Sequence, residues 1–118
     1  MIRNMMIGMI GYLYETGVTI NNIVSEKNDI IIYCELPENS YSYDEMKVNA
    51  DSFLKRVKEK IQEIFDHMYL KNNIRIKYKI IKGYNVTKDM RKKLHNDNLN
   101  NIYKYADTIC YFLCKHHR

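Results

Sequence analysis

The sequence contains no tryptophan, one proline and only four glycines among its 118 residues. This scarcity of proline and glycine excludes a flexible linker rich in these residues, so we expect one domain over residues 1–118. The cysteines number three, at Cys34, Cys110 and Cys114. An odd count does not fit the disulfide framework of small secreted proteins, which predicts free thiols and a cytoplasmic protein.

Motifs that carry catalysis or bind cofactors are also absent. The chain has no Walker loop and no GxGxxG, HExxH or GxSxG pattern. Cys34 with His67 or His95 would supply a nucleophile and a base, but Cys34 lies in an apolar run, where burial raises the pKa of a thiol. We therefore expect a protein that is not an enzyme and that has no cofactor.

Residues of the types that bind zinc gather at the C-terminus, where they are Cys110, Cys114, His116 and His117. Structural zinc sites usually draw on two separated ligand pairs, whereas these four residues crowd one end of the chain. Cys110 also falls on an apolar helix face, as a structural thiol would. We expect no metal site, and zinc binding at this terminus stays the alternative.

The first segment has an apolar face at helical spacing, which predicts a helix that ends at Gly17. The uncharged run from residue 5 to residue 14 is too short to span a bilayer, and no small-residue cleavage site follows it. Methionine makes up half of the apolar face, which suits either a core or an adaptable surface for a partner. The face consists of Ile2, Met5, Met6, Met9, Ile10 and Leu13.

Three runs have the pattern of strands. Residues 18–24 and 30–36 flank the polar connection 25–29 and predict a hairpin, which Pro37 ends. Residues 74–81 alternate between apolar and basic side chains and predict a third strand with one exposed face.

A long helix is expected between the second and third strands. Ser42 and Glu45 have the spacing of a capping box, so the helix is predicted to begin there and to run for about seven turns. Its apolar stripe favours packing on the sheet, with coiled-coil pairing as the alternative. The stripe consists of Met46, Ala50, Phe53, Leu54, Val57, Ile61, Ile64, Phe65 and Met68.

Two further helices, at residues 88–95 after a capping Thr87 and at residues 99–114, complete the chain. The predicted fold class is α+β, with a three-stranded, mainly antiparallel sheet, helices on one face and the element order α-β-β-α-β-α-α. Over residues 2–83 this order resembles that of the alkaline-shock proteins of Gram-positive bacteria. It is also similar to the KH arrangement, but without the GxxG loop that contacts nucleic-acid backbones, since Gly8 and Gly11 have that spacing within an apolar segment with no basic residues beside them.

Charge is distributed unevenly along the chain, whose formal net charge is +5. Residues 71–93 hold nine of the 19 basic residues and a single acid, Asp89. Within this window Arg75, Lys77 and Lys79 would share one strand face, about 7 Å apart. Such a block can contact phosphates, although a solvated surface or an edge strand protected by lysine explains it equally well.

Two functional hypotheses follow. In the first, the protein binds DNA or RNA through phosphate contacts, with Tyr84 stacking on a base. Its predicted interface is Arg75, Lys77, Lys79, Lys82, Tyr84, Arg91, Lys92 and Lys93. In the second, the protein is an interaction module, either a self-associating adaptor or an inhibitor of a larger protein. Its contact surface would be the Met-rich first helix or the turns that carry Tyr41, Tyr43, Tyr69 and Tyr84.

Overall fold

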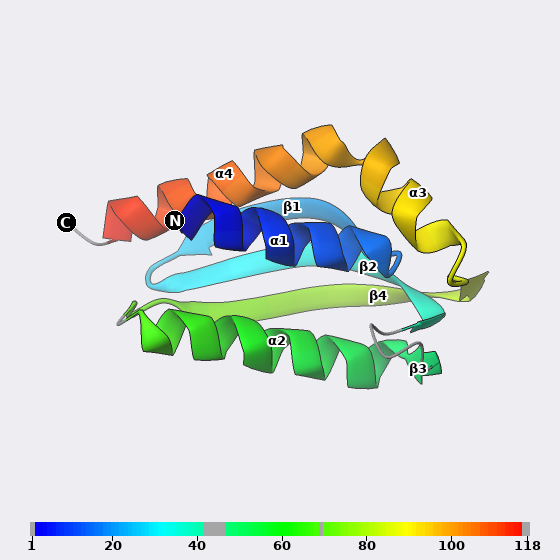
Figure 1. Cartoon of the computed structure of the whole chain (residues 1–118). Coiled ribbons are helices and arrows are strands. Elements are labelled where there is room, and N and C mark those ends of the chain that lie inside the picture. Colours follow the sequence, from blue (N-terminus) through cyan, green and yellow to red (C-terminus); the bar gives the residue numbers. More distant parts are fainter. Residues whose placement is uncertain (1, 42–46, 69, 117–118) are drawn as a thin grey trace.

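The computed structural model describes residues 2–41, 47–68 and 70–116, which form one small α+β domain. In these ranges a mainly antiparallel sheet of four strands packs against four helices around one hydrophobic core (Figure 1). The predicted fold class and element order are confirmed, although the sheet has one strand more than expected. None of the helices in this part of the chain is long and apolar enough to cross a bilayer.

Helix α1 (Ile2–Glu15) lies in the middle of the core because its apolar face meets both the sheet and other helices. Met6, Ile10 and Leu13 are each 1% exposed. The helix ends as predicted, at Gly17, which has a φ of 90°. The amide of Val18 then donates to the carbonyl of Leu13 at 3.0 Å, which closes the last turn and starts the first strand.

Strands β1 (Thr19–Glu26) and β2 (Asp29–Tyr41) form the expected antiparallel hairpin. Its turn is tighter than predicted, because Glu26 pairs directly with Asp29 and Lys27 adopts a φ of 56°. The prediction that Pro37 ends the second strand was wrong. A register shift between Pro37 and Asn39 accommodates the missing amide, so that β2 continues beyond it.

The predicted start of the long helix was also wrong. Residues 42–46, which include the expected capping box of Ser42 and Glu45, lie outside the described residues. Strand β3 (Lys47–Asn49) follows them and pairs antiparallel with the end of β2. Because the backbone of residues 47–49 is hydrogen-bonded to β2, these residues are not part of the helix. Helix α2 (Ala50–His67) then begins with Asn49 as its N-cap, whose side chain accepts a hydrogen bond of 2.9 Å from the amide of Ser52.

Strand β4 (Asn73–Asn85) pairs in parallel with β2, so that β2 lies between β1 and β4. Helix α2 therefore connects two parallel neighbours, as such a crossover requires. The register sets Ile30 opposite Ile74 and Ile32 opposite Ile76. The strand is longer than the predicted 74–81, because Gly83, with a φ of 80°, lets the chain continue toward Asn85.

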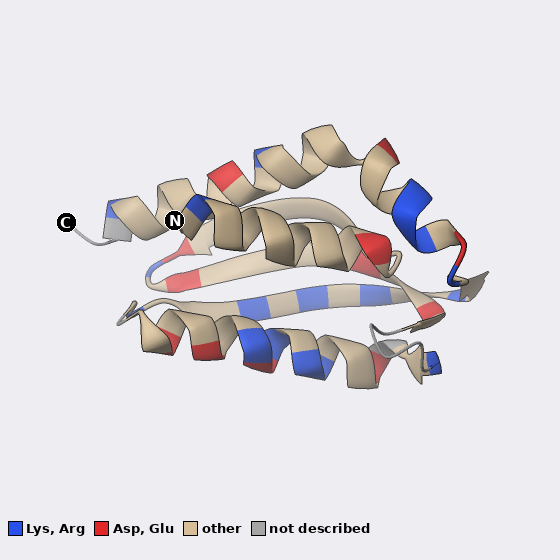
Figure 2. Cartoon of the chain, viewed as in Figure 1, with Lys and Arg blue, Asp and Glu red and all other residues tan. Residues whose placement is uncertain are grey.

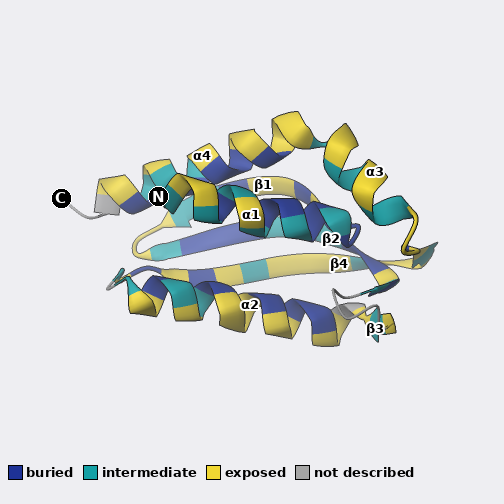
Figure 3. Cartoon of the chain, viewed as in Figure 1, coloured by how far each residue is buried: buried dark blue, intermediate teal, exposed yellow. Residues whose placement is uncertain are grey.

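The helices cover one face of the sheet. Alternate residues of β2, namely Ile30, Ile32, Cys34 and Leu36, join the core that α1 and α2 also form. Helix α3 (Met90–Asp97) packs on α1, beginning two residues later than predicted. Helix α4 (Leu99–His116) lies along α1 and buries Ile102, Ala106, Ile109 and Leu113. Figure 3 shows this burial along α1, β2 and the inner side of α4.

Candidate nucleic-acid interface

The sheet face opposite the helices carries the basic row that the sequence predicted. Arg75, Lys77 and Lys79 are all exposed, whereas the side chain of Ile74, on the other face of β4, is buried in the core. Residues paired across β2 and β4 share a face, and Tyr33 of β2 is the partner of Lys77. The ammonium of Lys77 lies 5.7 Å from the centre of the Tyr33 ring. An aromatic ring and a cation thus lie side by side on the uncovered face.

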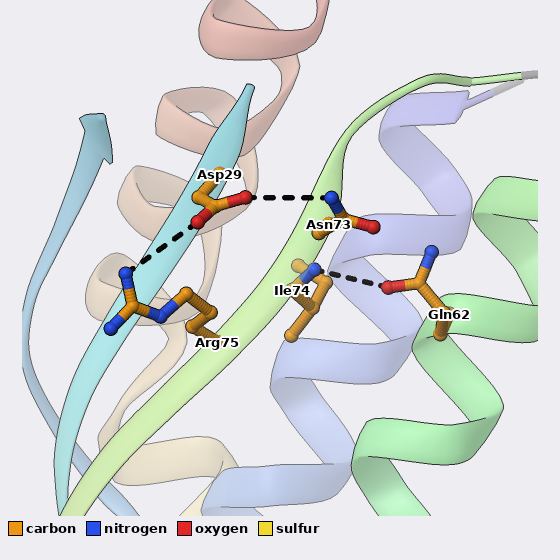
Figure 4. Close-up of polar contacts among 5 residues, drawn as sticks. All are labelled: Asp29, Gln62, Asn73, Ile74 and Arg75. Atoms are coloured by element: carbon orange, nitrogen blue, oxygen red, sulfur yellow. Dashed lines mark hydrogen bonds and ion pairs between the residues drawn. The ribbon is translucent and has the colours of Figure 1, made fainter. Parts of the chain in front are cut away.

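Acidic side chains of β2 reduce the positive charge of this face. Arg75 places Nη1 3.5 Å from Oδ2 of Asp29, and Figure 4 shows its side chain crossing in front of β2 toward that carboxylate. Glu35 is the register partner of Lys79. Both members of the Arg75–Asp29 pair are partly exposed, so the pair contributes little to stability and leaves the guanidinium accessible.

The remaining predicted residues lie elsewhere. Lys82 is exposed farther along β4. Tyr84 is half-buried, and its hydroxyl lies close to Gly17, which follows the end of α1. The structure therefore does not bring Tyr84 to the open face beside Lys77. Tyr84 is an odd number of residues away from Arg75, Lys77 and Lys79 along β4, so the alternation of the strand already directs its side chain to the opposite face.

The basic residues of α3 form a separate group, which Figure 2 shows on the short helix beyond the β4 row. Arg91 is ion-paired with Glu15 of α1 at 4.0 Å, and its side chain is only 16% exposed. Lys93 pairs with Asp97 at 3.4 Å, and Lys92 is exposed. Since Arg91 helps to join α3 to α1, the predicted interface is two surfaces rather than one.

Sequence reasoning did not assign half-buried Tyr33 to the open face of the sheet, because the run from residue 30 to residue 34 is apolar at every position. The sequence predicts core positions for Tyr33, Tyr78 and Tyr103 with their hydroxyls at the surface. Tyr33 is half-buried, whereas Tyr78 and Tyr103 are each 43% exposed. The hydroxyl of Tyr78 donates to Oδ1 of Asp51, and this hydrogen bond raises the pKa of Tyr78. The alternation along β4 was the available signal for the face of Tyr33. Residues paired across two neighbouring strands lie on the same face, so the partner of exposed Lys77 also lies on the open face.

Among the residues that the structure describes, no group of three or more histidine, cysteine or acidic side chains could hold a metal ion. Cys110 is half-buried, and burial raises the pKa of its thiol. Cys114 is exposed, and His117 lies outside the described residues. All three cysteines are free, as expected.

The first helix also borders a groove. An apolar hollow of about 210 Å³ lies between α1 and α2, with Met9, Tyr12 and Val57 in its wall and Arg56 and Lys60 at its margin. A neighbouring hollow is lined in part by Met5, Ile64 and Met68. Met5 and Met9 thus have two roles, since each packs against the core on one side and lines a groove on the other.

The chain matches no protein-family model, and comparison with the curated proteins and with the solved structures finds no match either. The resemblance of element order to the alkaline-shock proteins therefore stays a prediction. The function has to be inferred from the chemistry of the surfaces.

Proposed function

We propose that this protein is a cytoplasmic, non-enzymatic protein that binds single-stranded nucleic acid on the open face of its sheet. The observation that supports the proposal is the Lys77–Tyr33 pair, with Arg75 and Lys79 exposed on either side of it along β4. Free thiols agree with a reducing compartment.

The chemistry of this face suits an unpaired strand better than a duplex. An aromatic ring on a sheet stacks on bases that are splayed out, and bases within a duplex are not available for such stacking. Cations repeated along β4 would follow the backbone beside the stacked base. Because the two acids of β2 lie in the same face, we expect phosphate contacts to provide only moderate affinity, with strong salt dependence.

Fluorescence anisotropy of labelled single- and double-stranded DNA and RNA, at two salt concentrations, tests the proposal. We expect the single strands to bind more tightly. Replacing Tyr33 by alanine should weaken binding by about 1–3 kcal/mol because a stacked base is lost. Replacing Lys77 and Lys79 by glutamate should abolish binding at the higher salt concentration. Replacing a lysine that neutralises a phosphate should also reduce the slope of log affinity against log salt concentration by about 1.

The control is Lys115→Glu, which makes the same change of charge as either β4 substitution made alone, at an exposed residue of α4. Arg91→Glu is a poor test, because it would set a second carboxylate against Glu15 and disturb the joint between α1 and α3. Equal weakening by Lys115→Glu and by the β4 substitutions would mean unspecific attraction to a basic protein. Absence of binding at low salt would exclude the proposal.

A second candidate function is protein interaction through the apolar hollow between α1 and α2, and the presence of half-buried Met9 in its wall favours this function. Light scattering over a range of protein concentrations tests its self-associating form. If the groove holds a second copy, the mass should rise with concentration, and Met9→Glu should keep the protein monomeric because a carboxylate cannot be buried unpaired. Thr108→Glu on α4 is the control, and a constant mass for the unchanged protein would contradict self-association.

A further inference from the structure

Strand β4 lies at an edge of the sheet, since it pairs with β2 alone among the described strands. The amide of Ile74 points away from β2, because it donates to Oε1 of Gln62 on α2 at 3.1 Å (Figure 4). In a strand the amide and the carbonyl of a residue point to the same side, and the side alternates from one residue to the next. The outward backbone groups of β4 therefore belong to Ile74, Ile76, Tyr78 and Ile80.

Gln62 accepts the hydrogen bond of the first outward amide, that of Ile74, and of no other outward amide. The outward amides of Ile76, Tyr78 and Ile80 have no hydrogen-bond partner within residues 2–41, 47–68 and 70–116. Three successive donors with their acceptors make a template on which another strand can pair.

A hollow of about 230 Å³ runs beside this edge, between β4 and α2. Leu54 of α2, which is 5% exposed, and the half-buried Ile76 supply its apolar part. A strand added to β4 would direct alternate side chains toward the helix side of the sheet, where this hollow lies. The edge thus has a backbone template and a place for side chains next to it.

The charge around the edge selects the partner. Lys55 and Lys58 are exposed at the hollow on the helix side, and Lys77 and Lys79 are exposed on the open side. The one acid of the hollow, Asp51, already accepts a hydrogen bond from Tyr78. Cations therefore flank the edge on both faces of the sheet, so an acidic strand is complementary to it.

From this arrangement we propose that the β4 edge binds an extended acidic peptide as an additional strand, with its apolar side chains in the hollow beside α2. Pairing with β4 of a second copy is disfavoured, because Lys77 and Lys79 would then face their own copies. Lysine on an edge strand also prevents aggregation, which accounts for Lys77 and Lys79. It does not account for the hollow, nor for the two lysines that α2 adds.

Amide hydrogen exchange followed by NMR tests the proposal directly on the unchanged protein. The probe is a synthetic peptide of alternating glutamate and valine, about eight residues long to match the edge at the rise of a strand. We expect a saturating amount to slow exchange at Ile76, Tyr78 and Ile80 by at least about tenfold, since these amides gain partners. The counterpart with lysine in place of glutamate should leave the three amides unchanged.

Substitutions at one position separate backbone pairing from side-chain contact. Tyr78→Pro removes an outward amide, and proline is tolerated where the amide of an edge strand faces solvent. Its control is Tyr78→Ala, which loses the same ring and the bond to Asp51 but keeps the amide. We expect Tyr78→Pro to bind the peptide about tenfold more weakly than Tyr78→Ala, the effect of one lost hydrogen bond.

Charge reversal on α2 separates this surface from the open sheet face. Lys55→Glu with Lys58→Glu should weaken peptide binding and leave the Tyr33 face intact, while Lys115→Glu should change neither. Equal binding of the lysine peptide, protection of other amides instead, or protection by a single-stranded oligonucleotide would each overturn the proposal. So would a dimer that protects the same amides without peptide. If Tyr78→Pro does not fold, the exchange measured on the unchanged protein still decides.

Discussion

Replacing Gly17 by alanine is expected to lower the free energy of unfolding by about 2–4 kcal/mol, the sum of backbone strain and overpacking. Gly17 has a φ of 90°, which an alanine adopts only with strain. A Cβ there would lie 2.3 Å from Cγ2 of Val86 and 3.1 Å from Cγ of Pro37. Both residues are buried, so neither can move aside without disturbing the joint between the sheet and α1.

Urea unfolding at neutral pH measures this effect, and the other glycines provide matched controls. Gly8 lies in α1 with open space around it, so Gly8→Ala should keep or raise stability by up to about 1 kcal/mol. Gly83→Ala should show the strain without the clash, since Gly83 has a φ of 80° and no atom near its Cβ position. Equal stability of Gly17→Ala and Gly8→Ala would contradict the close packing described for this corner.

The second large effect expected is a loss of stability in alkaline solution. Cys34 and Tyr14 are buried, at 4% and 3% exposure. Burial raises the pKa of Cys34 from about 9 to about 12, and it raises the pKa of Tyr14 from 10 to about 12. The folded protein thus retains two protons that the unfolded chain releases more readily. Stability is full below pH 9 and falls as the pH rises toward 12, by about 1.4 kcal/mol per pH unit for each group.

Urea unfolding at several pH values between 7 and 11 checks this, since the linkage slope is a property of each titrating group. Cys34→Ala should flatten the decline that begins near pH 9, and Tyr14→Phe should flatten the part that begins near pH 10. Cys114→Ala, at an exposed thiol, should leave the profile as it is. In the native protein at neutral pH, a thiol reagent should modify Cys114 and spare Cys34. An unchanged alkaline slope in Cys34→Ala would refute the assignment.

The basic row of β4 could be predicted because its information is local. Side chains alternate along a strand, so the pattern of residues 74–81 already separates Arg75, Lys77 and Lys79 from the buried side, and the structure confirms their exposure. Tyr33 could not be assigned in the same way. Residues 30–34 are apolar throughout, so the face of Tyr33 became visible only with the register that pairs it with Lys77.

The basic window around α3 shows where local information ends. Nine cations within residues 71–93 look like one surface in the sequence. In the fold, Arg91 turns to Glu15, a residue far away in the chain, and Tyr84 turns toward Gly17. No periodicity carries the pairing of Arg91 with Glu15, because it depends on how α3 returns across α1.

By itself, the sequence determined the α+β class, the order of the elements and the sides on which the helices and β4 bury apolar residues. Those properties follow from periods of two and 3.6 residues and from residues such as Gly17 that end an element. Only the tertiary structure decided that β4 pairs in parallel with β2, that β3 replaces the expected helix start, and that one edge stays open beside α2. Strand pairing joins segments far apart in the chain, so the whole core selects it rather than any local pattern.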